Sequence, residues 1–170
     1  MNLYDVSVPV FVKALENLKN VLKKGAAYAG EKGVDPNQFL EAKLAPDMYN
    51  LVKQVQIASD SAKGISARLA GMEPPKMEDI EKTFAELFSR IDKTVDFLKT
   101  LKPEQFEGAD ERKIPFPYVE GKYLVGSDSL FESSLPNFFF HVVTAYGILR
   151  AQGVPLGKND YIGPLPLKDL

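Results

Sequence analysis

Residues 48–69 carry an unbroken helical pattern, which constrains the fold more than any other feature of the chain. Apolar side chains recur at alternating steps of three and four residues, and this spacing places them along one face of an α-helix. It is typical of the seam along which neighbouring helices pack in a left-handed bundle. The seam consists of Met48, Leu51, Val55, Ala58, Ala62, Ile65 and Leu69.

Three further segments show the same helical periodicity. One spans residues 8–33, another spans residues 80–103, and the last runs from near Ser134 to about Gln152. The helix of the opening pattern is expected to begin near Pro46. The last segment is apolar almost all round, so we expect it to be the most buried helix.

Residues 102–132 have a different residue pattern: strand-prone side chains lie on both sides of a Glu-Gly pair. Such runs around a turn are typical of a β-hairpin. Pro115 and Pro117 lack a backbone donor and confine the first strand to an edge. After Gly153, glycine and proline residues predict an extended arm over the body. The strand-prone residues are Ile114, Phe116, Tyr118, Tyr123, Leu124 and Val125.

These patterns predict an all-α fold: an antiparallel four-helix bundle that runs up, down, up and down, with a small β-hairpin between helices three and four. The chain has 170 residues, which is the usual length of one domain. We therefore expect a single helical-bundle domain over residues 1–170.

Composition and charge exclude several classes of partner and of chemistry. The chain has 23 acidic and 21 basic residues, so no long-range field is available to attract nucleic acid. It has no cysteine, which excludes disulfides, zinc-thiolate sites and thiol nucleophiles. No apolar run approaches the roughly 18–20 residues that span a bilayer, and the N-terminus lacks signal-peptide features. We expect a cytoplasmic protein with neither nucleic acid nor membrane as a partner.

His141 is the only histidine, and it lies on the apolar stripe of the fourth helix with Phe138 and Ala145. A buried ring nitrogen needs a polar partner. The ring is either a metal ligand or general base in a pocket, or a core histidine satisfied by a carboxylate, hydroxyl or water. We favour the core histidine, because no second histidine or clear ligand pair accompanies it.

Carboxylates do not complete an obvious metal site. Di-iron bundles use a Glu-x-x-His pattern, but residue 138 is Phe. Gln54 and Asp60 lie beside the seam of the second helix, where they either face a pocket or flank the core, and we favour the flanking position. The acids of the first and third helices fall mostly on polar faces and are expected to be solvated: Glu16, Glu81, Glu86, Asp92 and Asp96.

Tyr146 and Arg150 are candidates for a ligand site, because they lie four residues apart on one helical face. An anion or a small polar ligand could lie there. The alternative, which we favour, is that Tyr146 packs inward and Arg150 pairs with an acid near the helix end. Tyr123 in the hairpin is a further candidate at a pocket mouth.

Two segments resemble a known family: LAPDMYNLVKQVQIASDSAKGISARLAG and LPNFFFHVVTAYGILRAQGVPLGKNDYIG. They resemble an uncharacterised bacterial domain-of-unknown-function family, itself similar to the DinB/YfiT-like four-helix-bundle superfamily. The resemblance covers most of residues 1–165. It implies the DinB-like bundle fold, often as a homodimer.

Metal-binding members of that superfamily carry a fourth-helix motif resembling H-x-x-x-H-x-x-x-H-R-x-Q, and a histidine on the second helix. When the motif is aligned with this chain, it begins at His141, and Arg150 matches its Arg. The two later, metal-binding histidines correspond to Ala145 and Leu149, and the helix-two position to Gln54 or a neighbour. The resemblance therefore implies neither a metal site nor a cofactor here.

No phosphate-binding glycine loop or G-x-S-x-G elbow is present, so no standard catalytic motif assigns a function. Three functions remain open. The first and favoured one is a non-metal binding or interaction module, homodimeric, with a small molecule as its partner and His141, Tyr146, Arg150 and Gln54 as candidate ligand-binding residues. The second is a metal-independent enzyme with His141 as acid or base, which requires a pocket that reaches the ring. The third is a metalloenzyme, which requires two acids converging on His141.

Overall fold

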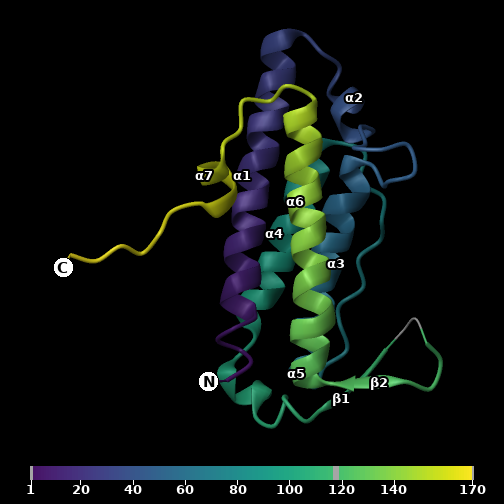
Figure 1. Cartoon of the computed structure of the whole chain (residues 1–170), viewed down its shortest axis with the longest axis vertical. Helices are drawn as coiled ribbons and strands as arrows, with labels where there is room; N and C mark the ends of the chain where they lie inside the picture. The colour runs from purple at the N-terminus through teal and green to yellow at the C-terminus, as the bar shows by residue number, and fades with distance from the viewer. Residues whose placement is uncertain (1, 117–118, 170) are drawn as a thin grey trace.

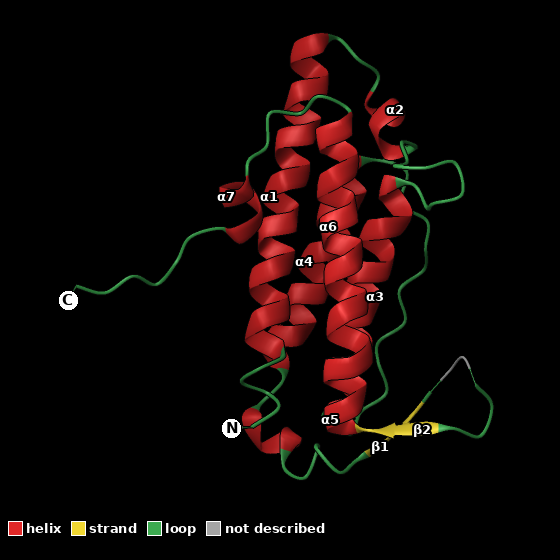
Figure 2. Cartoon of the chain, viewed as in Figure 1, coloured by secondary structure: helices red, strands yellow, loops and turns green. Residues whose placement is uncertain are grey.

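The computed structural model describes residues 2–116 and 119–169, and it is mainly helical, as predicted. Four long helices lie side by side along the molecule (Figures 1 and 2). They are α1 (Val8–Lys32), α3 (Leu51–Leu69), α4 (Phe84–Thr100) and α6 (Leu135–Ala151). Their apolar stripes meet in one core, in which Phe11, Leu15, Leu69, Ile91 and Phe138 are fully buried.

Short elements connect the long helices. They are α2 (Pro36–Leu40), the 3-10 turn η1 (Pro103–Phe106), β1 (Lys113–Pro115), β2 (Tyr123–Val125), α5 (Gly126–Asp128), the π-helical turn η2 (Ser129–Ser134) and α7 (Lys158–Ile162). Strand β2, α5 and the π-helical turn η2 continue into α6 without a break, so the hairpin connects directly to the most apolar helix.

The two strands pair antiparallel and form the small sheet of the expected hairpin. Lys113 lies opposite Val125, and Pro115 lies opposite Tyr123. The Lys113 ammonium sits 4.9 Å from the centre of the Tyr123 ring, and Tyr123 is half exposed. Of the expected hairpin, residues 117–118 lie outside the described residues.

The directions of the long helices differ from the sequence prediction. Lys19 pairs with Asp92, and Glu16 with Lys99, so α1 and α4 are antiparallel. Contacts from α3 to α6, described below, also run antiparallel. In contrast, Phe11 of α1 packs against Phe138 of α6, and Gly25, later in α1, lies against Leu149, later in α6, so those two helices run parallel. The order is therefore up, down, down and up. The predicted alternation was wrong because residues 70–83 are a long crossover that returns along α3 before α4 begins (Figure 1).

Two helices start later than their apolar patterns suggest, because capping residues set their ends. Asn50 caps α3 by accepting from the backbone N–H of Lys53, and Thr83 caps α4 by accepting from that of Glu86. Ile80, which the pattern placed in the third helix, lies before this cap and is 67% exposed.

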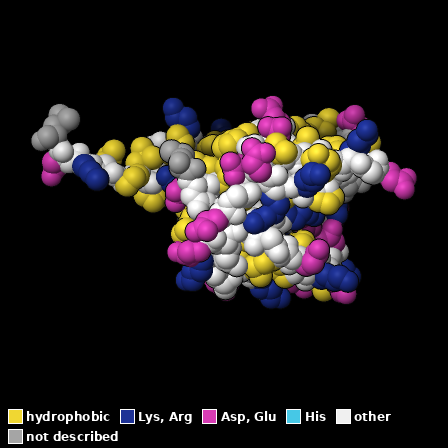
Figure 3. Space-filling view, turned by 90° about the horizontal axis from the view of Figure 1, so that it is seen from below, with side chains coloured by type: hydrophobic (Ala, Val, Ile, Leu, Met, Phe, Trp, Pro, Cys, Tyr) yellow, Lys and Arg dark blue, Asp and Glu magenta, His cyan; other side chains and the backbone are white. Residues whose placement is uncertain are grey.

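The C-terminal arm is only partly extended over the body. Helix α7 packs on α1, where the Asn17 amide donates to the carbonyls of Tyr161 (3.1 Å) and Ile162 (2.9 Å). Beyond Gly163 the chain projects away from the body (Figures 1 and 3). In the described part of the chain, no helix combines the length and hydrophobicity that a bilayer span requires.

Candidate functional site

His141 and Gln54 meet in the interior between α6 and α3. Their contact joins His141 Nδ1 to Gln54 Oε1 at 2.6 Å, and Gln54 Nε2 donates to the carbonyl of Tyr49 at 3.0 Å. An amide oxygen only accepts, so Nδ1 carries the proton and donates. Both residues are buried, with 7% and 1% of their surface exposed. Burial lowers the pKa of His141, because the charged ring would lose its hydration.

The residues around this pair do not fit the kind of metal site that the metal-binding members of the DinB-like superfamily carry. Ala145 and Leu149, which stand at the superfamily's later histidine positions, are fully buried in the apolar core. Gln54 already holds Nδ1 of the only imidazole, and an amide is a poor ligand for a transition metal. Within the described residues, no three His, Asp or Glu side chains lie close enough together to hold an ion.

Tyr146 and Arg150 hold the chain that follows α6. The Tyr146 hydroxyl donates to the carbonyl of Leu156 at 3.4 Å, and Arg150 Nη1 donates to the carbonyl of Val154 at 2.8 Å. Arg150 thus bonds a backbone carbonyl, where we expected an acid. These two residues lie beyond His141 on α6 and do not join it in a common site.

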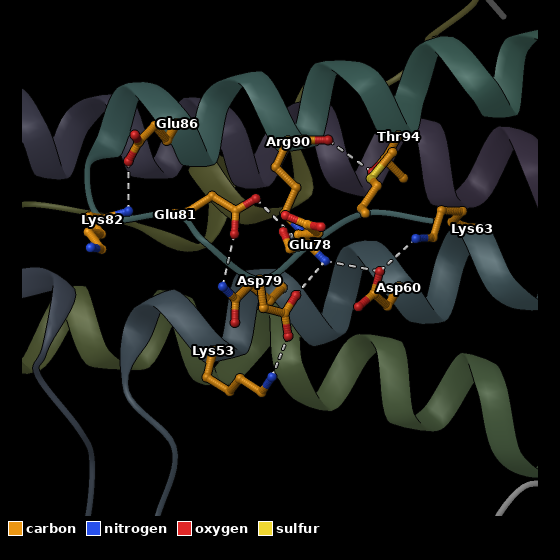
Figure 4. A network of polar contacts seen from close by, with 12 residues as sticks. Lys53, Asp60, Lys63, Glu78, Asp79, Glu81, Lys82, Glu86, Arg90 and Thr94 are labelled. Atoms are coloured by element: carbon orange, nitrogen blue, oxygen red, sulfur yellow. Dashed lines mark hydrogen bonds and ion pairs between the residues drawn. The ribbon is translucent and has the colours of Figure 1, made fainter. Parts of the chain in front are cut away.

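A buried arginine organises the other polar cluster, which lies between α3, α4 and the crossover (Figure 4). The Arg90 side chain is 1% exposed. Its Nη2 lies 3.0 Å from Asp60 and 3.0 Å from Asp79, and its Nη1 lies 3.0 Å from Glu81. Arg90 Nη1 also donates to the carbonyl of Glu78. One guanidinium therefore ties the crossover to both helices.

The crossover acids are held in their charged form. Burial alone raises the pKa of Asp79, but the hydrogen bond from Lys53 and the charge of Arg90 outweigh it and lower that pKa. Glu81 behaves alike: burial raises its pKa, whereas hydrogen bonds from Gln56 and Arg90 lower it below the usual value. Its side chain is 10% exposed, so the expectation of a solvated Glu81 was wrong.

Arg90 was not among the predicted site residues, although the sequence carries a signal for it. Arg90 follows Leu87 by three residues and precedes Thr94 by four, which places it on the buried face of its helix. An arginine on that face requires acids nearby, and Asp60 beside the seam of the second helix was available.

A groove of about 360 Å³ opens between α3, β1 and the π-helical turn. Its wall carries hydroxyl, amide and charged groups beside isoleucines, and across it the Asn137 amide donates to the Ser61 hydroxyl at 2.7 Å. His141 lines neither this groove nor three further cavities of the described chain. The polar residues of the groove are Asp60, Ser61, Arg68, Ser129, Ser133, Ser134 and Asn137.

The surface seen from the hairpin end carries both signs of charge. Basic and acidic side chains are interspersed over this face (Figure 3). This distribution agrees with a formal net charge of −2 and gives polyanions no extended basic surface on that side.

Fold and site together define a mainly helical domain with a small antiparallel hairpin and an imidazole–amide pair in its interior. Residues 3–162 match the family described as "Domain of unknown function (DUF1993)", and the chain belongs to that family. The structure is similar to the crystal structure of a DinB family member protein from Shewanella denitrificans. The two sequences are 44% identical, the match covers 99% of this chain and 96% of that one, and the TM-score is 0.95. No curated protein matches the sequence.

Proposed function

We propose that this protein is a metal-free binding module built on a DinB-like four-helix bundle. The observation that carries the proposal is the bond between His141 and Gln54. It uses the Gln54 amide, which stands at or beside the helix-two position where metallated relatives carry a histidine ligand, and it leaves the His141 imidazole with Nε2 as its one free nitrogen. The buried Ala145 and Leu149 supply no donor that could replace it.

Binding, as opposed to catalysis through His141, follows from where the cavities lie. A general acid or base must reach its substrate within hydrogen-bond distance, and His141 lines neither the groove nor the three further cavities described above. The groove between α3, β1 and the π-helical turn has a volume within the usual range of small-molecule sites. A small molecule is therefore the partner we assign to this scaffold.

Calorimetric titration with zinc, nickel or manganese tests the metal-free assignment. We expect no stoichiometric binding to chelator-treated, untagged protein, because Nε2 of His141 is a single nitrogen ligand and the buried Ala145 and Leu149 offer no second one. Uptake of one ion per chain, with an affinity that falls in His141→Ala, would contradict the proposal.

We also propose that the module is a homodimer, with the outer face of α6 as the contact. Phe140 (56% exposed) and Val143 (49%) lie on that face, and exposed Leu44 packs beside Gly147 on the same side. Such clustered apolar surface is typical of interaction sites.

Sedimentation velocity tests the dimer. The measured mass should be about twice the 18.9 kDa chain mass, and Phe140→Ser should lower it to the mass of the monomer. Leu167→Ser, on the projecting arm, should leave the dimer intact; a wild-type chain that is monomeric throughout would refute the contact.

A further inference from the structure

Arg68 is the one groove residue whose charge has no partner in the described part of the chain. It lies near the end of α3, it is partly buried, and no described hydrogen bond or ion pair involves its guanidinium. The same side chain also lines the neighbouring cavity of about 460 Å³ beside residues 74–78. A partly desolvated guanidinium without an acid favours an added anion.

Gly64 makes the position of Arg68 possible. A Cβ atom on Gly64 would lie 2.9 Å from Arg68 Nη1, so the guanidinium folds back over the glycine, one turn earlier on the same helix. Glycine within a helix costs roughly 1 kcal/mol relative to alanine. Glycine at position 64 therefore leaves space for the Arg68 guanidinium, although it lowers the stability of the helix.

The nearby acid does not neutralise Arg68. Asp60 Oδ1 lies 2.9 Å from Lys63 Nζ and 3.0 Å from Arg90 Nη2, so its charge is already shared by two cations. Figure 4 shows Asp60 between these two groups. The groove is thus left with a net positive charge at Arg68.

The opposite wall supplies hydrogen-bonding groups. The π-helical turn before α6 places Ser129, Ser133 and Ser134 along the groove, and Asn137 follows one turn later. A π-helical turn is rare and is frequent at functional sites. Ile57, Ile65 and Ile114 form the apolar part of the lining.

From this arrangement we propose that the groove binds a small organic anion, with its carboxylate or phosphate on Arg68, its polar groups on the serines and Asn137, and its apolar part on the isoleucines. This inference deepens the proposed function and rests on it. A small, mixed groove with one charged anchor is the usual form of such sites. Carboxylate and phosphate share the oxyanion chemistry that a guanidinium recognises, so the two are separated by experiment.

The test is a heteronuclear NMR titration of chelator-treated protein with inorganic phosphate, phenyl phosphate, acetate and benzoate, at constant ionic strength. We expect saturable shifts at Ser61, Arg68 and Ser133, with the aromatic anions binding more tightly than the bare ones. The stronger pair, phosphates or carboxylates, identifies the anion.

Three variants locate the binding. Arg68→Gln should weaken it by at least about tenfold, the usual effect of losing a charge-assisted hydrogen bond. Gly64→Ala keeps the charge but displaces the guanidinium and should also weaken binding while it favours the helix. Arg150→Gln, at the other candidate anion site, should leave the affinity unchanged.

The proposal is overturned if none of the four anions binds, if Arg68→Gln binds as the wild type does, or if only Arg150→Gln loses binding. Because the titration uses metal-free protein, its failure is distinct from failure of the metal-free assignment. A chain that takes up zinc stoichiometrically would overturn that assignment whatever the anions do.

Discussion

Arg90→Met is expected to destabilise the protein by about 3 kcal/mol. Removing one partner from a buried ionic cluster costs roughly 3–5 kcal/mol, because the remaining charges lose their compensation. The lower end applies here, since the side chains of Asp60 and Asp79 are 42% and 35% exposed and water reaches them. Methionine keeps the length of the side chain, so the change reports mainly on charge.

Urea unfolding of the variant measures this loss, and Lys93→Met is the matched control. Lys93 is an exposed lysine on the same helix, so its replacement should change the free energy of unfolding by no more than about 0.5 kcal/mol. The crossover should also become more sensitive to proteolysis in Arg90→Met. Equal stability of the two variants would show that Arg90 does not hold the crossover.

Acid should act on the same cluster. Because the folded-state pKa values of Asp79 and Glu81 are lowered, their stabilisation is present above the ordinary carboxyl values and is lost as the pH falls through the folded-state values. The loss of stability between pH 5 and about pH 3 should therefore be smaller in Arg90→Met than in the wild type.

Gly126→Ala is expected to cost about 3 kcal/mol or more. A Cβ atom on Gly126 would overlap the backbone carbonyl oxygen of Ala109, and it would lie 2.9 Å from a methyl of Leu69. A backbone atom cannot rotate away as a flexible side chain can, so the segment that joins the hairpin to α6 must shift. Overpacking of this kind usually costs roughly 1–3 kcal/mol, and more where backbone is involved.

Gly30→Ala is the control for that variant. Gly30 lies within α1, and a Cβ there meets no atom within 4 Å. Alanine should therefore stabilise the helix by roughly 0.5–1 kcal/mol. Thermal unfolding of the two variants should move in opposite directions, and a Gly126→Ala protein as stable as the wild type would contradict the close approach.

The apolar spacing predicted the helical elements well, because periodicity reports directly on which face is buried. Leu51, Val55, Ala58, Ala62 and Leu69 are all fully buried, as the seam required. It could not predict the direction of α4, since a helix buries the same stripe whichever way it runs. The crossover sets that direction, and Arg90, which holds the crossover through Asp79, also pairs with Asp60 of α3, 30 positions earlier in the chain.

The candidate site was predictable only in part. Periodicity placed His141 among apolar residues and Gln54 beside the seam, but their contact depends on the pairing of α3 with α6. The groove at Arg68 escaped prediction, because its lining comes from three separate segments and its serines lie on a π-helical turn. No local pattern in the chain indicates that turn.

The state of the His141 ring tests the central claim most directly, and its nitrogen NMR signals are unambiguous because the chain has one histidine. We expect a neutral ring protonated at Nδ1, with a pKa below the ordinary value and no change on addition of zinc. A ring that titrates as a free imidazole, or whose nitrogen signals move to those of a zinc-bound histidine, would contradict the account.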